Sequence, residues 1–332
     1  MKKLVKWITV MFFSIFVLSA CGNNNEQPTT VTTTQTENTT SSQETQTSSL
    51  EQTTKENTPS DAQTAYPLTI TDSMGYEITF EKEPEKVVSL GPNITEMVFA
   101  LDSQEKLVGR TEYCDYPEEV SSIESVGTLT QPDVEKIISL NPDVVIASIH
   151  FSEEAKRQLE DIGIKVVILF EEHKMDGVYT MIETLGAIVN QNDKAAETIA
   201  DMKERIAAVQ ERVKEKEAPS VYYVVGFGEY GDFTAGNDTF IHELITLAGG
   251  NNIAKDISGW NFSLEKLVEL DPEIIIVGTG IKDSFMTAEN YKDLSAVKNG
   301  KVYEIDNNLL DRQGVRNAQG VEILADTFHP AE

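Results

Sequence analysis

Two stretches of thirteen residues decide the fold: Val134-Glu-Lys-Ile-Ile-Ser-Leu-Asn-Pro-Asp-Val-Val-Ile146 and Leu264-Glu-Lys-Leu-Val-Glu-Leu-Asp-Pro-Glu-Ile-Ile-Ile276. They align without a gap, and each pattern is typical of an amphipathic helix, a proline-containing turn and a buried strand. Any helix–turn–strand unit has this general form. The shared Glu-Lys pair and the shared proline nevertheless favour a duplicated lobe.

Short apolar segments separated by helical patterns surround both copies. The predicted strands are residues 86–90, 107–110, 143–148, 165–169, 221–227, 273–278 and 301–305, and a hairpin at 68–70 and 76–80 precedes them. Apolar strands that alternate with helices indicate parallel sheets covered on both faces. We therefore expect an α/β fold of two Rossmann-like lobes, residues 66–190 and 218–332, with a cleft between them.

The segment between the lobes predicts a long helix. Residues 193–217 contain no Gly or Pro and are rich in Ala, Glu, Lys and Arg. As one helix they would span about 37 Å at 1.5 Å per residue. We interpret residues 191–217 as a rigid connection between the lobes; the alternative is a surface helix of one lobe.

The first 65 residues resemble a targeting signal followed by a tether. Lysines and a short apolar run precede Leu18-Ser-Ala-Cys21, which resembles the lipobox of a lipoprotein signal peptide over residues 1–20. Acylation of Cys21 would anchor the chain on the extracytoplasmic face of the cell membrane; a plain signal peptide is the alternative. Of the 44 residues 22–65, 30 are Ser, Thr, Asn or Gln, which predicts a disordered tether, or else a glycosylated stalk.

Charge and motif spacing exclude several functions. The chain has 332 residues and a net charge of −28, which argues against a nucleic-acid partner. The four histidines are dispersed, and the sequence contains neither a paired-cysteine nor an HExxH metal motif. We expect no catalytic residues, no metal site and no cofactor, and Cys114 fits an inert packed thiol.

One motif points to another class of protein. Gly226-Phe-Gly228-Glu-Tyr-Gly231 follows a predicted strand and fits the GxGxxG pattern of a dinucleotide-binding enzyme. That mechanism needs a helix to begin at the third glycine. Here the next plausible helix cap is Asp238, so we interpret the glycines as a loop and keep the enzyme as an alternative.

Aromatic side chains follow several of the predicted strands. Tyr113 and Tyr116 come after the strand at 107–110, Phe227 and Tyr230 follow the strand at 221–227, and Trp260 precedes the second repeat. Ligands of open parallel sheets bind beyond the carboxyl ends of the strands. These five residues therefore predict an aromatic cleft for a large, partly apolar ligand, with a core position as the alternative for Phe227.

Two glutamates occupy corresponding places in the two lobes. Glu96 follows Gly91-Pro-Asn-Ile-Thr, and Glu243 follows Gly236-Asn-Asp-Thr-Phe-Ile-His. Glu96 could form a capping box with Asn93. If each is exposed, the pair could dock onto arginines of a partner protein.

The segments just quoted resemble the substrate-binding lipoproteins of ABC importers for vitamin B12, haem and iron–siderophore complexes. The resemblance covers about residues 68–330 and is carried by Val87-Val-Ser-Leu-Gly-Pro-Asn-Ile-Thr-Glu96, Tyr113-Cys-Asp-Tyr-Pro117, Leu140-Asn-Pro-Asp-Val-Val-Ile146, Phe240-Ile-His-Glu-Leu-Ile245, Ala248-Gly-Gly250 and His329-Pro330. It implies a monomer that does no catalysis and delivers a small molecule to a permease with its ATPase subunits. It also implies that Glu96 and Glu243 dock on that permease.

The resemblance also implies ligand contacts. Tyr113, Asp115 and Tyr116 are similar to the cleft segment of cobalamin-binding members, and Trp260 is similar to an aromatic that closes the cleft. Arg312 lies in a segment that carries two arginines in the family, although Val315 replaces the usual proline. Since few arginines are free to bind anionic groups, we favour a corrinoid over the alternatives, a ferric siderophore or haem.

Overall fold

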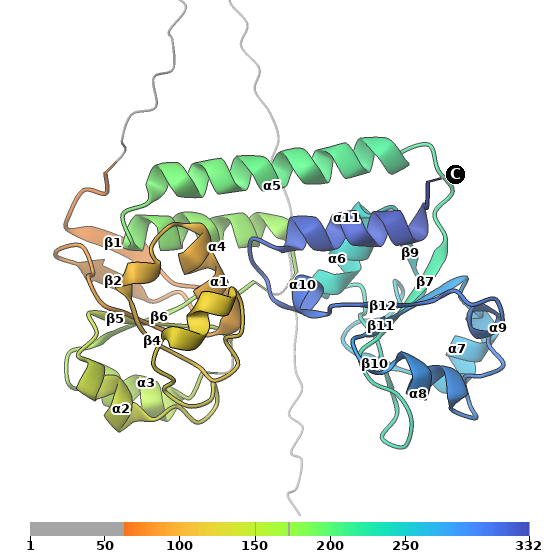
Figure 1. Cartoon of the computed structure of the whole chain (residues 1–332), viewed down its shortest axis with the longest axis horizontal. Coiled ribbons are helices and arrows are strands. Elements are labelled where there is room, and N and C mark those ends of the chain that lie inside the picture. The colour runs from red at the N-terminus through yellow and green to blue at the C-terminus, as the bar shows by residue number, and fades with distance from the viewer. Residues whose placement is uncertain (1–62, 150, 172, 332) are drawn as a thin grey trace, which may run out of the picture. The chain divides into compact units, whose positions relative to one another are not determined.

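A computed structural model describes residues 63–149, 151–171 and 173–331 (Figure 1). The predicted signal peptide, Cys21 and nearly all of the predicted tether lie outside these residues. Among the residues described, no helix combines the length and apolar character needed to cross a bilayer.

Each lobe is built on a four-stranded parallel sheet. The first sheet has the order β4-β3-β5-β6, and the second has the order β12-β11-β7-β9. Their strands are β3 (Val87–Leu90), β4 (Leu107–Arg110), β5 (Val144–Ala147), β6 (Lys165–Ile168), β7 (Ser220–Val224), β9 (Asn251–Asn252), β11 (Ile274–Gly278) and β12 (Val302–Ile305). Numbered along the chain within each lobe, both sheets have the order 2-1-3-4. The shared topology confirms the predicted α/β fold and supports duplication.

The two copies of the repeated sequence form the same local structure. Helix α2 (Val134–Leu140) leads into β5, and α7 (Leu264–Leu270) leads into β11. In each, the residue before the helix caps it: Asp133 accepts from Lys136 N at 2.9 Å, and Ser263 accepts from Lys266 N at 3.1 Å. Each helix also ends on a left-handed residue, Asn141 or Asp271. Both units supply the third strand of their sheet.

The first lobe begins earlier than the sequence predicts. Strands β1 (Leu68–Thr71) and β2 (Glu77–Phe80) form the expected antiparallel hairpin. Before it, Thr64 donates its backbone N–H to Asn190 Oδ1 at 2.8 Å and its hydroxyl to Ala187 O at 2.9 Å. The prediction that the tether extends to residue 65 is therefore wrong at its end, because Thr64 is bound to the body.

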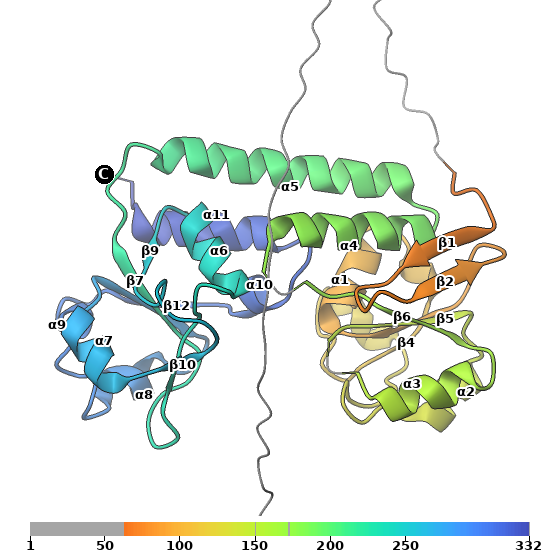
Figure 2. The same ribbon diagram turned by 180° about the vertical axis from the view of Figure 1, so that it is seen from behind.

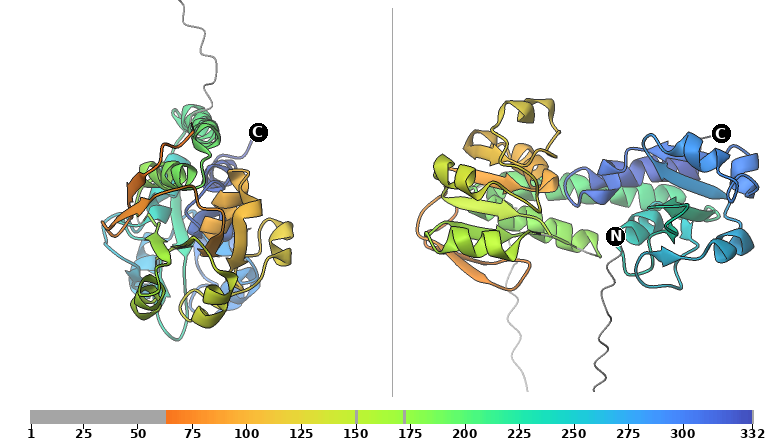
Figure 3. Two further views of the ribbon diagram at one scale, coloured as in Figure 1. Left: turned by 90° about the vertical axis from the view of Figure 1, so that its left-hand side faces the viewer. Right: turned by 90° about the horizontal axis from the view of Figure 1, so that it is seen from below.

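The long helix connects the lobes by packing, not only by its length. Helix α5 (Asn192–Val213) contacts α4 (Met175–Ile188), α6 (Phe240–Leu247) and α11 (Asn317–Phe328). Figures 1 and 2 show α5 running alongside α4 and α11 on one side of both sheets, and Figure 3 shows these helices bridging the two lobes. Arg205 on α5 makes a two-pronged ion pair with Glu322 on α11, with bonds of 2.8 and 2.7 Å.

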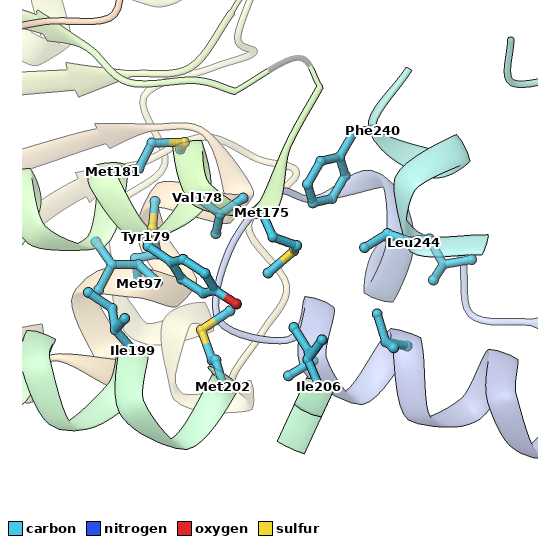
Figure 4. Close-up of a cluster of buried hydrophobic side chains, with 14 of the residues drawn as sticks. Met97, Met175, Val178, Tyr179, Met181, Ile199, Met202, Ile206, Phe240 and Leu244 are labelled. Atoms are coloured by element: carbon cyan, nitrogen blue, oxygen red, sulfur yellow. The ribbon is translucent and has the colours of Figure 1, made fainter. Parts of the chain in front are cut away.

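One apolar core continues from lobe to lobe beneath α5. Met97, Met175, Val178, Tyr179, Met202, Ile206, Phe240 and Leu244 belong to a single buried cluster (Figure 4). They come from α4, α5, α6 and α1 (Pro92–Ala100). We call this interlobe part of the core the apolar seam. The lobes are therefore joined by packed side chains, whereas the sequence suggested halves held apart by a rod.

The remaining elements are short helices that lie beside the sheets and short strands within the loops. They are α3 (Glu153–Glu160), β8 (Asp232–Phe233), β10 (Asn261–Phe262), α8 (Lys282–Thr287), α9 (Ser295–Lys298) and α10 (Asn308–Asp311), with 3-10 turns at Gln104–Lys106 and Glu118–Ser122. Strands β8 and β10, which both follow β7 in the chain, pair with each other. This pairing holds the loop that carries Trp260 beside the second sheet.

Candidate functional site

A cavity of about 780 Å³ opens between the lobes. In the second lobe its lining includes Val224 at the end of β7, Gly278 at the end of β11, and Asn307 just after β12. In the first lobe it includes Ile149 after β5 and Glu171 after β6. All of these residues lie at carboxyl ends of parallel strands, where open sheets bind ligands. The volume suits an organic molecule better than a bare ion.

A carboxyl group with a hydrogen-bond donor at each oxygen lies in the cavity wall of the second lobe. Asp311 accepts a hydrogen bond from Tyr223 OH at 3.1 Å and another from Asn307 Nδ2 at 2.9 Å. Burial raises the pKa of Asp311, although these two donors favour its charged form. Burial also raises the pKa of Tyr223 well above its ordinary value. Both oxygens of Asp311 have a donor, so the group is held in one orientation.

Trp260 stands on a braced loop of the second lobe. Asp238 accepts hydrogen bonds from the Ser258 hydroxyl and, at 2.7 Å, from Gly259 N. The hydroxyl and the amide together lower the pKa of Asp238. Trp260 O accepts from Thr234 N at 2.8 Å. The backbone is therefore fixed on both sides of an indole that remains 45% exposed at the cavity.

The first lobe's wall of the cavity includes residues just before α4. Glu171 Oε1 accepts from His173 N at 2.7 Å and from Lys174 N at 3.1 Å. His173 Nδ1 lies 2.6 Å from Asp238 O, so this wall contacts the second lobe directly. Gly177 makes room for Glu171, because a Cβ at position 177 would lie 1.5 Å from Glu171 Oε2.

The charge of the cavity is acidic. Glu171, Asp238 and Asp311 line it, and the lining residues that the structure describes include no Lys or Arg. A ligand with several carboxylates would meet only like charges here, whereas a neutral or cationic hydrogen-bond donor would be favoured.

Only one of the seven predicted ligand residues lines this cavity, and that residue is Trp260. Phe227 is partly buried and packs edge-on against Phe285 and Tyr291, with ring centroids 5.1 and 5.5 Å away. Ligand contact by Phe227 stays a prediction. Tyr230 is 89% exposed on the loop between β7 and β8. Ligand contact by Tyr230 stays a prediction.

The other four predicted residues gather around the loop between α10 and α11. Arg312 Nη1 lies 2.7 Å from Asp115 Oδ1, and Arg312 Nη2 lies 3.5 Å from Tyr113 O. The ring of Tyr116 lies 4.2 Å from Arg316 Cζ, a cation–π contact. Tyr113 and Tyr116 are about half exposed. Ligand contact by these residues stays a prediction, and Arg312 is already paired within the protein.

The two predicted docking glutamates are engaged inside the body. Glu96 is buried and makes ion pairs with Arg312 and Arg316, so the expectation that it is exposed is wrong. It forms no capping box, since the residue before α1 is Gly91 and no side chain caps that helix. Glu243 Oε2 accepts from Met175 N at 2.7 Å. Docking by either residue stays a prediction.

The glycine-rich loop lacks the geometry of a dinucleotide site. Strand β8 begins directly after Gly231, and the next helix, α6, begins at Phe240 behind a Thr239 cap. The helix N-terminus that would face a pyrophosphate is therefore missing from this loop. In the described part of the chain, no three His, Cys, Asp or Glu side chains gather as a metal site requires.

Sequence reasoning missed most of the cavity wall. Asn307 and Asp311 follow the predicted strand at 301–305, so the pattern indicated their place at the carboxyl edge, whereas Tyr223 lies inside the strand predicted at 221–227. Glu171 and His173 follow the strand at 165–169 in the same way.

Comparison with known proteins places the chain in a family. Residues 87–309 match the family described as periplasmic binding protein, and the chain belongs to it. An uncharacterized ABC transporter substrate-binding lipoprotein of Bacillus subtilis is 36% identical over 273 residues, 80% of this chain and 86% of that protein. A cobalamin-binding protein of Halobacterium salinarum is 29% identical over 280 residues, 80% of this chain and 75% of that protein.

Solved structures share the fold. The haem-binding protein of Roseiflexus sp. RS-1 in its apo form is 25% identical with a TM-score of 0.68, over 74% of this chain and 98% of that one. The vitamin B12-binding protein of Vibrio cholerae is 23% identical with a TM-score of 0.64, over 74% and 96%. Membership of a family of solute-binding proteins confirms that the chain is not an enzyme.

Proposed function

We propose that this protein is the extracytoplasmic substrate-binding component of an ABC importer and that its ligand is a corrinoid. A lipid on Cys21 would hold it at the cell membrane, where it would act as a monomer with a permease and its ATPase subunits. The Bacillus subtilis relative, an ABC transporter substrate-binding lipoprotein, supports the importer. The cobalamin-binding relatives from Halobacterium and Vibrio support the ligand.

The observation that carries the choice of ligand is the charge of the cavity. Its described wall has three carboxyl side chains and no Lys or Arg. A corrinoid presents amide groups that can donate hydrogen bonds to carboxylates, and it carries little net negative charge. Haem and many ferric siderophores carry carboxylates, which this wall would repel.

A ferric siderophore or haem is the second candidate. An iron(III)–citrate-binding protein of Bacillus subtilis is 28% identical over 225 residues, and haem-binding proteins share the fold. Arg312 and Arg316, whose charge would suit such a ligand, are already paired with Glu96.

The test is a visible-absorbance titration of the purified full chain with cyanocobalamin, haemin and a panel of ferric siderophores. The proposal predicts saturable one-to-one binding of cyanocobalamin, and weaker or no binding of the others. Tight binding of haemin or a siderophore without binding of cyanocobalamin would overturn the corrinoid assignment and leave the importer class in place.

A further inference from the structure

Glu96 lies at the centre of a buried ionic network that joins the lobes. Its Oε1 accepts from Arg312 Nη1 at 2.8 Å and from Arg316 Nη2 at 2.7 Å, and its Oε2 accepts from Arg316 Nε at 2.8 Å. The Glu96 side chain is 2% exposed, and the two arginines are 14% and 13% exposed. Glu96 is on α1 of the first lobe, whereas both arginines follow β12 of the second.

Glu243 makes the reverse connection. It is on α6 of the second lobe, and it accepts a hydrogen bond from the backbone N–H of Met175, the first residue of α4 in the first lobe. Lys174 Nζ is 3.9 Å from its other oxygen. A carboxylate is favoured at this position because the first N–H groups of a helix have no partner within it.

The two connections occupy related places in the duplicated fold. Helices α1 and α6 are the first α-helices after the first strand of their sheets, and each glutamate lies in its early turns. Each carboxylate bonds to the opposite lobe. The apolar seam of Figure 4 includes side chains of α1, α4 and α6, the helices that carry Glu96, Met175 and Glu243, and Met97 of α1 and Met175 of α4 both belong to it.

Both connections border the cavity. Gln313 lines the cavity and lies between Arg312 and Arg316 in the chain; His173 lines it two residues before Met175. Each connection therefore lies beside a cavity wall in the chain. The methionines of the seam can repack when the lobes shift, since Met side chains adapt to altered surroundings.

We propose that Glu96 and Glu243 are a matched pair of interlobe clasps that together set the separation of the lobes and the width of the cavity. The Glu96 clasp consists of Glu96, Arg312 and Arg316, and the Glu243 clasp consists of Glu243 and the start of α4. Because both close the same two lobes, release of one loosens the other. This coupling does not depend on which ligand the protein carries.

Hydrogen exchange followed by mass spectrometry tests the coupling in the ligand-free full chain. Glu96→Gln keeps the side-chain volume and removes the charge, and Glu243→Ala removes the acceptor of the Met175 amide. We expect Glu96→Gln to speed exchange about tenfold in a peptide that spans the start of α4, far from the substitution in sequence. Glu243→Ala should speed exchange in the Arg312–Arg316 segment, since coupling is reciprocal.

Glu322→Gln is the matched control, because it breaks an equally well-aligned arginine pair that lies between α5 and α11. It should leave exchange at both clasps unchanged. Faster exchange in the central strands β3 and β11 would mean that Glu96→Gln destabilises the whole fold. In that case the milder Arg312→Gln, which retains the bonds between Arg316 and Glu96, is measured instead. Faster exchange confined to the substituted clasp, with the other clasp unchanged, would overturn the proposal.

Discussion

Substitution of Trp260 by alanine should weaken ligand binding by a calculable amount. An aromatic side chain buries about 150–250 Å² when it is fully covered. Since 45% of Trp260 is exposed in the ligand-free protein, a ligand that covers the indole would bury about 70–110 Å² of it. At about 25 cal/mol per Å² this is about 2–3 kcal/mol, or roughly a 30–150-fold increase in Kd.

Isothermal titration of the full chain with cyanocobalamin measures that change in Kd. The braced loop means that the backbone should stay in place, so the free energy of unfolding should change little. Tyr76→Ala is the control, because Tyr76 is 50% exposed on the hairpin and does not line the cavity. An unchanged Kd for Trp260→Ala, or an equal loss for Tyr76→Ala, would refute the reasoning.

Three further predictions concern stability. Phe227→Ala should lower the free energy of unfolding in urea by about 1–3 kcal/mol, because its partly buried ring packs on two core aromatics; an unchanged free energy of unfolding would contradict this packing. The guanidinium of Arg205 lowers the pKa of Glu322, so this pair stabilises the fold above the ordinary carboxyl pKa and ceases to do so as pH falls through the lowered value. Glu322→Gln should therefore cost up to about 1 kcal/mol at neutral pH and nothing in strong acid, and a pH-independent difference would contradict the assignment. Asn141→Gly should be neutral or stabilise by up to about 1 kcal/mol, because φ at Asn141 is 50°. Asp271→Gly should instead destabilise the protein, because Asp271 also accepts two hydrogen bonds at the start of α9. Thermal melts of the two variants measure this difference, and equal changes in Tm at the two sites would contradict it.

Local pattern predicted the sheets and the repeat. The strands at 107–110 and 301–305 and the hairpin follow from apolar runs and turn residues, which act over a few positions. The left-handed C-caps of α2 and α7, Asn141 and Asp271, lie within the thirteen repeated residues, whereas the N-caps Asp133 and Ser263 immediately precede them.

The clasps and the seam could not be predicted in that way. Glu96 pairs with Arg312 and Arg316, which are 216 and 220 residues further along the chain. A glutamate early in a helix has the same local signature whether it is exposed or buried. Its burial depends on how the second lobe packs, and the sequence of α1 contains nothing about that packing.

The sequence predicted where the cavity lies but not which residues line it. The carboxyl edges of the two sheets are indeed its walls, as the strand order requires. Of the aromatic residues expected to line the cavity, Trp260 does so. The ring of Phe227 packs on Phe285 and Tyr291 of its own lobe, which provide an apolar surface for it.

The most direct test of the account is the fluorescence of Trp260. The chain has two tryptophans, so a Trp7→Phe variant leaves Trp260 as its single reporter inside the cavity. Titration of this variant with cyanocobalamin should quench the emission saturably, with one equivalent bound per chain. Emission that falls only in proportion to added ligand, as it would for free tryptophan, would contradict a corrinoid held between the lobes.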